Sequence, residues 1–159
     1  MKIAKQAVCA AFMVVLTASL GFGAINKYSA HLEGKAEVPA VESKAGGDAN
    51  FTVTADGKEI TYVIKVKNIE NVTAAHIHAG KRVEIGKVVA GLFAGPKKEG
   101  KFSGELIEGT ITRKDLTGPL AGKTIKDLID LMKKGDAYVN VHTTTNPGGE
   151  IRGEIYAMP

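Results

Sequence analysis

The sequence predicts an all-β fold, an antiparallel Greek-key-like β-sandwich that carries one short amphipathic α-helix. Apolar and polar residues alternate with a period of two over several short segments, which is typical of half-buried strands. Turns that contain glycine separate these segments. One segment near residue 125 instead has its apolar residues at helical spacing. A small closed barrel built from the same strands is the alternative architecture.

Residues 1–24 are predicted to be a secretory signal peptide. Lys2 and Lys5 form a positively charged start, an uncharged apolar run follows over residues 7–20, and small residues end at Ala24. We therefore expect cleavage near Gly23 or Ala24 and an exported protein, either periplasmic or extracellular. Because about 20 apolar residues can span a bilayer, an uncleaved membrane anchor is the alternative.

Removal of the signal peptide leaves one domain, residues 25–159, that is almost neutral and has no cysteine. Cys9 is the only cysteine of the chain, so the mature domain forms no disulfide and depends on a packed core. Without Lys2 and Lys5, 19 basic residues remain against 17 acidic ones, a net charge of +2. Nucleic-acid-binding domains need clustered basic residues, so this balance predicts no nucleic-acid partner.

The clearest pair of strands is a hairpin between residues 51 and 66. Phe51 and Val53 alternate with threonines before the Asp56-Gly57 turn, and the alternation continues over Ile60–Val66. Further strands are predicted at Tyr28–Leu32, Val72–His78, Lys87–Phe93, Phe102–Ile111, Ala137–His142 and Glu150–Tyr156.

The helix is predicted from about Thr124 to Lys134. Its apolar residues share one face, which we expect to lie on the sheet: Ile125, Leu128, Ile129 and Met132. Thr124 and Asp127 form a capping pair at its start, and Gly135 follows its last turn.

Three of the four histidines stand in two distinctive strings. In a strand, residues two apart point to the same face and lie roughly 6.5 Å apart, so His76 and His78 can converge on one ion while Ile77 packs into the core. In the second string, Val139 and Val141 would face the core, which places Asn140 and His142 on the opposite face.

If these strands are neighbours, three imidazoles meet in a site suited to copper or zinc. Asn140 is then a hydrogen-bond partner either of a ligand imidazole or of a loop backbone. The alternative is that His76, His78 and His142 are ordinary surface residues. His31 could supply a fourth nitrogen from the first strand, although nothing around it resembles a site.

The last strand carries alternating charges at Glu150, Arg152 and Glu154. We expect these side chains to share one face and to form an exposed charge ladder with a neighbouring strand. The alternative makes Arg152 an anion-binding group beside the histidines.

Six segments in order resemble the CHRD domain family, named after the repeated domain of chordin and found in exported bacterial proteins. These segments are Glu37–Val41, His76–His78, Gly109–Thr112, Asp115-Leu116, Ala137–Thr143 and Gly148–Glu154. After His78 this chain has Ala79-Gly80-Lys81-Arg82, where the family often has Gly-Pro. The resemblance implies the fold more than the function, because the family's biochemical role is poorly defined.

We therefore expect a protein that is not an enzyme and that binds one copper or zinc ion through His76, His78 and His142, for metal holding or delivery. The expected partner is a protein that exchanges the metal. A rival from another class is a metal-free adhesion or scaffold module that contacts an extracellular protein or polysaccharide. The third hypothesis is that the protein is a redox enzyme with a single metal ion. A membrane contact is expected here only if the signal segment stays uncleaved.

Overall fold

The computed structural model describes residues 27–159, so the predicted signal peptide lies outside the described residues. The strands are β1 (Lys27–Glu33), β2 (Gly46–Val53), β3 (Ile60–Ala79), β4 (Lys87–Phe93), β5 (Lys98–Ile111), β6 (Ala137–Thr143), β7 (Ile151–Glu154) and β8 (Tyr156–Ala157). The helices are α1 (Ile125–Lys134) and three short 3-10 turns, Gly34–Ala36, Arg113–Asp115 and Gly118–Leu120.

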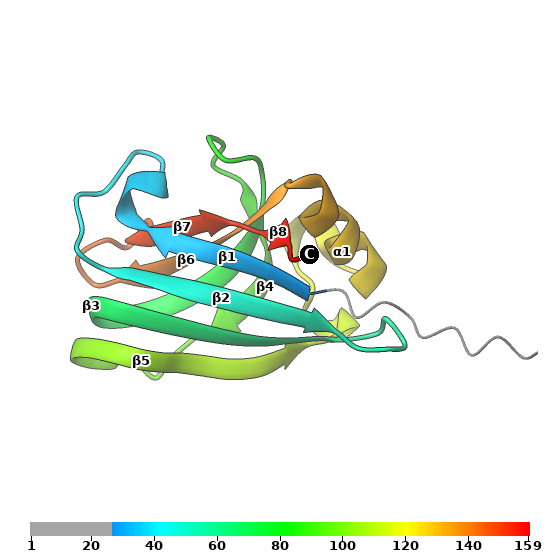
Figure 1. Cartoon of the computed structure of the whole chain (residues 1–159), viewed down its shortest axis with the longest axis horizontal. Coiled ribbons are helices and arrows are strands. Elements are labelled where there is room, and N and C mark those ends of the chain that lie inside the picture. The colour runs from blue at the N-terminus through cyan, green and yellow to red at the C-terminus, as the bar shows by residue number, and fades with distance from the viewer. Residues whose placement is uncertain (1–26) are drawn as a thin grey trace, which may run out of the picture.

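The strands form a single eight-stranded sheet that closes on itself (Figure 1). Its order is β2-β1-β7-β6-β3-β4, and β3 also pairs with β2, which completes a ring. β5 pairs with β3, and β8 pairs with β1. The all-β prediction is confirmed. The Greek-key sandwich is not, because the strands close into one barrel-like sheet rather than two separate ones, which is closer to the alternative architecture.

The 20-residue strand β3 pairs with different strands along its two halves. Its first part pairs with β2 and β5, and its last part, which carries His76 and His78, pairs with β4 and β6. Asn68 and Asn71 between them have φ of 52° and 54°. Asparagine tolerates this left-handed backbone better than most residues, so the strand changes direction and continues where the sequence predicts two strands.

The hairpin and the helix agree with their predictions. Phe51 in β2 lies opposite Tyr62 in β3, and both are buried. Thr124 and Asp127 form the capping box of α1, and Gly135 ends the helix with φ of 70°. The helix packs against β6 and β8. Its four predicted core residues are buried: Ile125, Leu128, Ile129 and Met132.

One continuous hydrophobic core receives side chains from β1 to β7 and from α1. Ile77, Val139 and Val141 belong to it with no exposed surface, so the neighbouring residues of β3 and β6 face the other way. That opposite face holds the histidines. Within residues 27–159 no helix is long and apolar enough to cross a bilayer.

Candidate metal centre

His76, His78 and His142 meet on the outer face of β3 and β6. The two strands pair antiparallel, with Asn140 opposite His76 and Ala74 opposite His142. Each histidine offers one ring nitrogen, and the three nitrogens lie within 4.8 Å of one another. Because nitrogens that share one ion at about 2 Å are themselves roughly 3 to 4 Å apart, small side-chain rotations suffice to bring the three onto one ion.

Hydrogen bonds to backbone carbonyls orient two of the rings. Nδ1 of His78 donates to the carbonyl of Gly86, and Nδ1 of His142 donates to that of Pro147, each at 2.9 Å. A carbonyl only accepts, so both Nδ1 atoms carry the proton and both Nε2 atoms present a lone pair. Bonds of this kind are the usual way in which proteins fix the orientation of a metal-binding imidazole.

The Nε2 lone pairs of His78 and His142 lie in different surroundings. Nε2 of His142 accepts a hydrogen bond from Nδ1 of His76 at 3.0 Å. Nε2 of His78 is buried and has no hydrogen-bond partner within the described chain. A buried polar atom without a partner costs free energy, so this nitrogen is available to a ligand. The neighbouring Asn140 side chain acts on the same ring, since its hydrogen bonding partly offsets the lowering of the His78 pKa by burial.

Burial keeps all three imidazoles neutral at pH 7. Desolvation lowers the pKa of His76 to about 4, and its neighbours His142 and His78 lower it further, because each disfavours a second positive charge. Desolvation also lowers the pKa of His78 and that of His142, although their carbonyl bonds act in the opposite direction. Neutral imidazole is the form that binds a metal.

The order of these elements along the chain agrees with a known family. A family model described as the CHRD domain matches residues 28–155, which is most of the chain. The chain belongs to the CHRD domain family. No curated protein and no solved structure gave a significant match. In this CHRD domain, two of the segments that carry the resemblance supply the three histidines, since His76–His78 end β3 and Ala137–Thr143 form β6.

Tyr138 and Arg152 form one wall of the histidine cluster. The Tyr138 ring stacks on His78 with an angle of 11° and a centroid distance of 4.9 Å. The Arg152 guanidinium lies 3.4 Å from the centroid of the same tyrosine ring, and it donates to the carbonyls of Lys81 and Glu84.

The prediction of an exposed charge ladder is therefore wrong. Arg152 is only 3% exposed, because residues 80–86 fold over the face that the alternation left open to solvent. Glu150 also lies away from a ladder, since it accepts hydrogen bonds from Ser43 and Thr143.

Glu37 and Asn140 make a second buried polar group that the sequence did not indicate as a pair. Both are more than nine-tenths buried, and Oε1 of Glu37 and Oδ1 of Asn140 lack hydrogen-bond partners in residues 27–159. A side chain at Gly149 would overlap Glu37 and crowd Asn140, so all three meet at the turn that carries Pro147. Burial raises the pKa of Glu37 to about 7, and the positive charge of Arg152 partly offsets this.

His31 lies apart from the cluster. It is on β1, its side chain is exposed, and Nδ1 lies 2.9 Å from the carboxylate of Asp48 on β2. The candidate metal-binding group found among the described residues consists of the other three histidines. A fourth nitrogen from His31 is therefore not part of this geometry.

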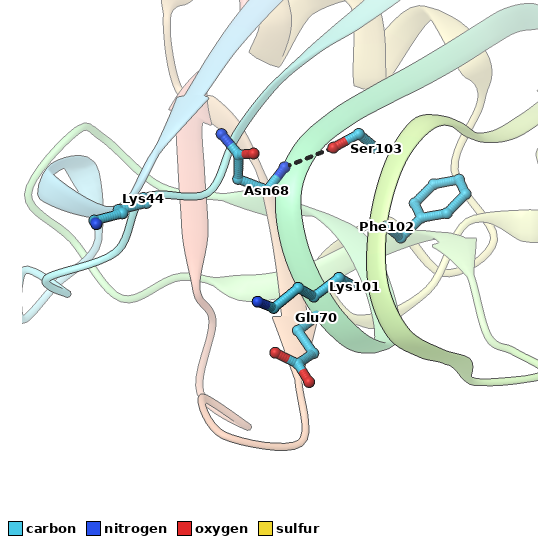
Figure 2. Close-up of a pocket in the computed structure, with 6 residues that line it drawn as sticks. All are labelled: Lys44, Asn68, Glu70, Lys101, Phe102 and Ser103. Carbon is cyan, nitrogen blue, oxygen red and sulfur yellow. Dashed lines mark hydrogen bonds between the residues drawn. The ribbon is translucent and has the colours of Figure 1, made fainter.

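A separate surface pocket of about 430 Å³ lies beside the bend of β3 (Figure 2). It is lined by Lys44, Asn68, Glu70, Lys101, Phe102 and Ser103. The backbone N–H of Asn68 donates to the Ser103 hydroxyl at 2.9 Å, which ties β3 to β5 at this point. In Figure 2 the ring of Phe102 points away from the two lysines, and the pocket combines polar and apolar surface.

Proposed function

We propose that this CHRD domain binds a single copper or zinc ion through His76, His78 and His142. The observation that carries the proposal is the cluster itself, in which each of the three rings offers one nitrogen and these nitrogens all lie within 4.8 Å of one another. Nε2 of His78 is in addition buried, with its lone pair free. The carbonyl bonds to His78 and His142 support it, because they hold both rings in the tautomer that a metal needs.

Copper is the ion that we favour. Imidazole nitrogen suits both copper and zinc, and copper(II) binds more tightly than zinc to a given set of nitrogen ligands. Three protein ligands leave a position open for water, a small ligand or a donor group from another protein. We therefore propose metal holding or delivery rather than catalytic turnover, with a metal-exchanging protein as the partner.

The experiment is a titration of the mature protein, purified without a histidine tag, with copper and with zinc. We expect about one equivalent of copper to bind, and we expect His76→Ala, His78→Ala and His142→Ala each to weaken binding at least tenfold. His31→Ala is the matched control and should bind like the wild type. Wild-type protein that binds no ion, or equal losses in His31→Ala, would contradict the proposal.

A metal-free adhesion module remains the second candidate, and the pocket of Figure 2 favours it. Lys44 and Lys101 line that pocket together with the polar Asn68 and Ser103 and one carboxylate, Glu70. The lining therefore keeps an excess of one positive charge, which suits an acidic polysaccharide or protein segment. Binding of an acidic polysaccharide that is lost in the double variant Lys44→Ala/Lys101→Ala, and kept in His76→Ala, would favour this candidate.

We also propose that the protein is exported, to the periplasm or beyond, with residues 1–24 removed. The support is the pattern of charged, apolar and small residues in that segment. Mass spectrometry of the protein isolated from its native host should show a chain that begins near Ile25. An intact chain in the membrane fraction would instead indicate a retained anchor.

A further inference from the structure

The loop between β3 and β4, residues 80–86, carries two aliphatic side chains in water. It rises as the green loop at the top of Figure 1. Val83 is 77% exposed and Ile85 is 78% exposed. In the described chain, only Tyr156 and Met158 are other large hydrophobic residues with comparable exposure, at 52% and 46%. Two such side chains, separated by one residue, thus form an apolar tip.

Hydrogen bonds at the base of the loop hold this tip outward. The Arg152 guanidinium bonds to the carbonyls of Lys81 and Glu84 at 2.8 and 2.9 Å. The Glu84 carboxylate accepts from the Lys81 N–H, and the Glu84 N–H donates back to the Lys81 carbonyl. The Gly86 N–H donates to the hydroxyl of Tyr138. A loop held in this way cannot easily fold its aliphatic side chains back onto the protein.

Positive charge surrounds the tip. Lys81, Arg82 and Lys87 are exposed on and beside the loop, whereas the one acidic side chain, Glu84, is engaged in the loop's own turn. Arg82 also lines a cleft with Tyr156, but the carboxylates of Glu33 and Glu154 line the same cleft, so the basic character belongs to the loop itself. Aliphatic side chains flanked by basic ones are typical of surfaces that enter a lipid interface.

The shape of the tip favours a bilayer over a protein. A stable protein interface buries roughly 800 Å² on each partner, which two protruding side chains do not supply. A fluid bilayer needs no matching pocket, because acyl chains rearrange around an inserted side chain. Cationic side chains near the surface of an anionic bilayer add electrostatic attraction.

We propose that residues 80–87 dock this domain onto an anionic lipid bilayer, with Val83 and Ile85 inserted and Lys81, Arg82 and Lys87 on the phosphates. Docking needs no metal ion. The carbonyl of Gly86 at the base of the loop holds Nδ1 of His78, so the docked domain carries its histidine cluster directly behind the membrane contact.

The test is co-sedimentation of the processed, exported protein with vesicles of phosphatidylcholine alone or with about equal parts of phosphatidylglycerol. We expect at least tenfold tighter binding to the anionic vesicles, weakened by added salt. The double variant Val83→Ser/Ile85→Ser should bind at least tenfold more weakly, whereas Met158→Ser, which removes an exposed apolar side chain elsewhere, should bind like the wild type.

Equal binding of the wild type and the Val83→Ser/Ile85→Ser variant would overturn the proposal, as would no preference for anionic vesicles. Both substitutions lie on exposed side chains, and an unchanged circular dichroism spectrum checks that the variant is folded. His142→Ala removes a metal ligand whose ring bonds to Pro147 and not to the loop, so its loss of metal binding with vesicle binding intact separates this proposal from the metal site. Stable complexes with an acidic protein, without vesicle binding, would also overturn it.

Discussion

Each imidazole of the cluster is neutral because it is buried, and this neutrality determines how the site responds to acid. Burial lowers the pKa of His76 to about 4 and also lowers the pKa values of His78 and His142. A proton competes with the metal only when the solution pH approaches the pKa of the ligand. Lower pKa values therefore extend metal binding to lower pH.

Copper affinity should accordingly change little between pH 8 and pH 6.5 and should fall at lower pH, with His76, whose pKa is about 4, protonated only in the most acidic solutions. The measurement is a series of competition titrations against a chelator of known proton affinity. An affinity that falls around the ordinary histidine value of about 6.5 would show that these rings are hydrated, contrary to the structure.

Glu37 makes a prediction about stability. Its pKa is about 7 in the folded protein, above its ordinary value of 4.5, so between these values the folded state binds more protons than the unfolded state. The contribution of the protonated Glu37 carboxyl to the free energy of unfolding is fully present below pH 4.5 and is lost as the pH rises through 7. Glu37→Gln, which cannot ionise, should therefore raise the free energy of unfolding at pH 8 by about 3 kcal/mol.

Urea unfolding of Glu37→Gln and wild type at pH 8 and pH 4.5 measures this difference. The gain should be present at pH 8 and should disappear at pH 4.5. Glu42→Gln is the matched control, because Glu42 is exposed and lies in the same segment. An equal effect of Glu37→Gln at both pH values would mean that the carboxyl is not protonated in the fold.

The pattern of residues indicates the three histidines but not their surroundings. A period of two shows that His76 and His78 share a face of their strand, and that His142 lies on the face of its strand that points away from the core, unlike its neighbour Val141. It does not show that residues 80–86 fold over this face, and so it left Arg152 on the surface. Glu37 stands in a segment that the family resemblance included, yet its burial depends on contacts with Gly149 and Asn140, far away in sequence.

At the scale of the element, α1 is the part that the sequence predicts best, because its capping box, apolar face and terminal glycine are all local signals. Ile129→Asp places a charge on the buried face and should destabilise the fold by about 3 kcal/mol or more. Lys133→Gln, on the exposed face, should change stability by less than about 0.5 kcal/mol. Thermal unfolding of both variants tests this prediction. If Ile129→Asp changed stability as little as Lys133→Gln does, the face of α1 that carries Ile129 would lie in solvent, contrary to the structure.

β3 shows where local signals are insufficient. Asn68 and Asn71 interrupt the alternation, which predicts two strands, but the chain continues as one because both residues adopt left-handed backbone within the strand. Each part then pairs with different neighbours. Strand partners depend on contacts between distant segments, which periodicity does not contain.

At the scale of the molecule, the closed sheet is what brings the histidines together. β6 lies beside the last part of β3, so His142 meets His76 across 66 residues of sequence. The sequence predicts all-β structure and the facing of each strand, but sandwich and barrel share these local patterns. The β2–β3 hairpin is local and is predicted, so the distant pairings of β3 with β6 and of β1 with β7, which complete the ring, separate the two architectures.

The most direct measurement of the central claim is a crystal structure of the mature protein loaded with copper, with anomalous diffraction recorded at the copper edge. We predict one copper ion among His76, His78 and His142, with nitrogen–metal distances of about 2 Å. We also predict that the bonds from His78 to Gly86 and from His142 to Pro147 are retained. An anomalous peak elsewhere on the protein, or no peak among the three imidazoles at full loading, would contradict this account.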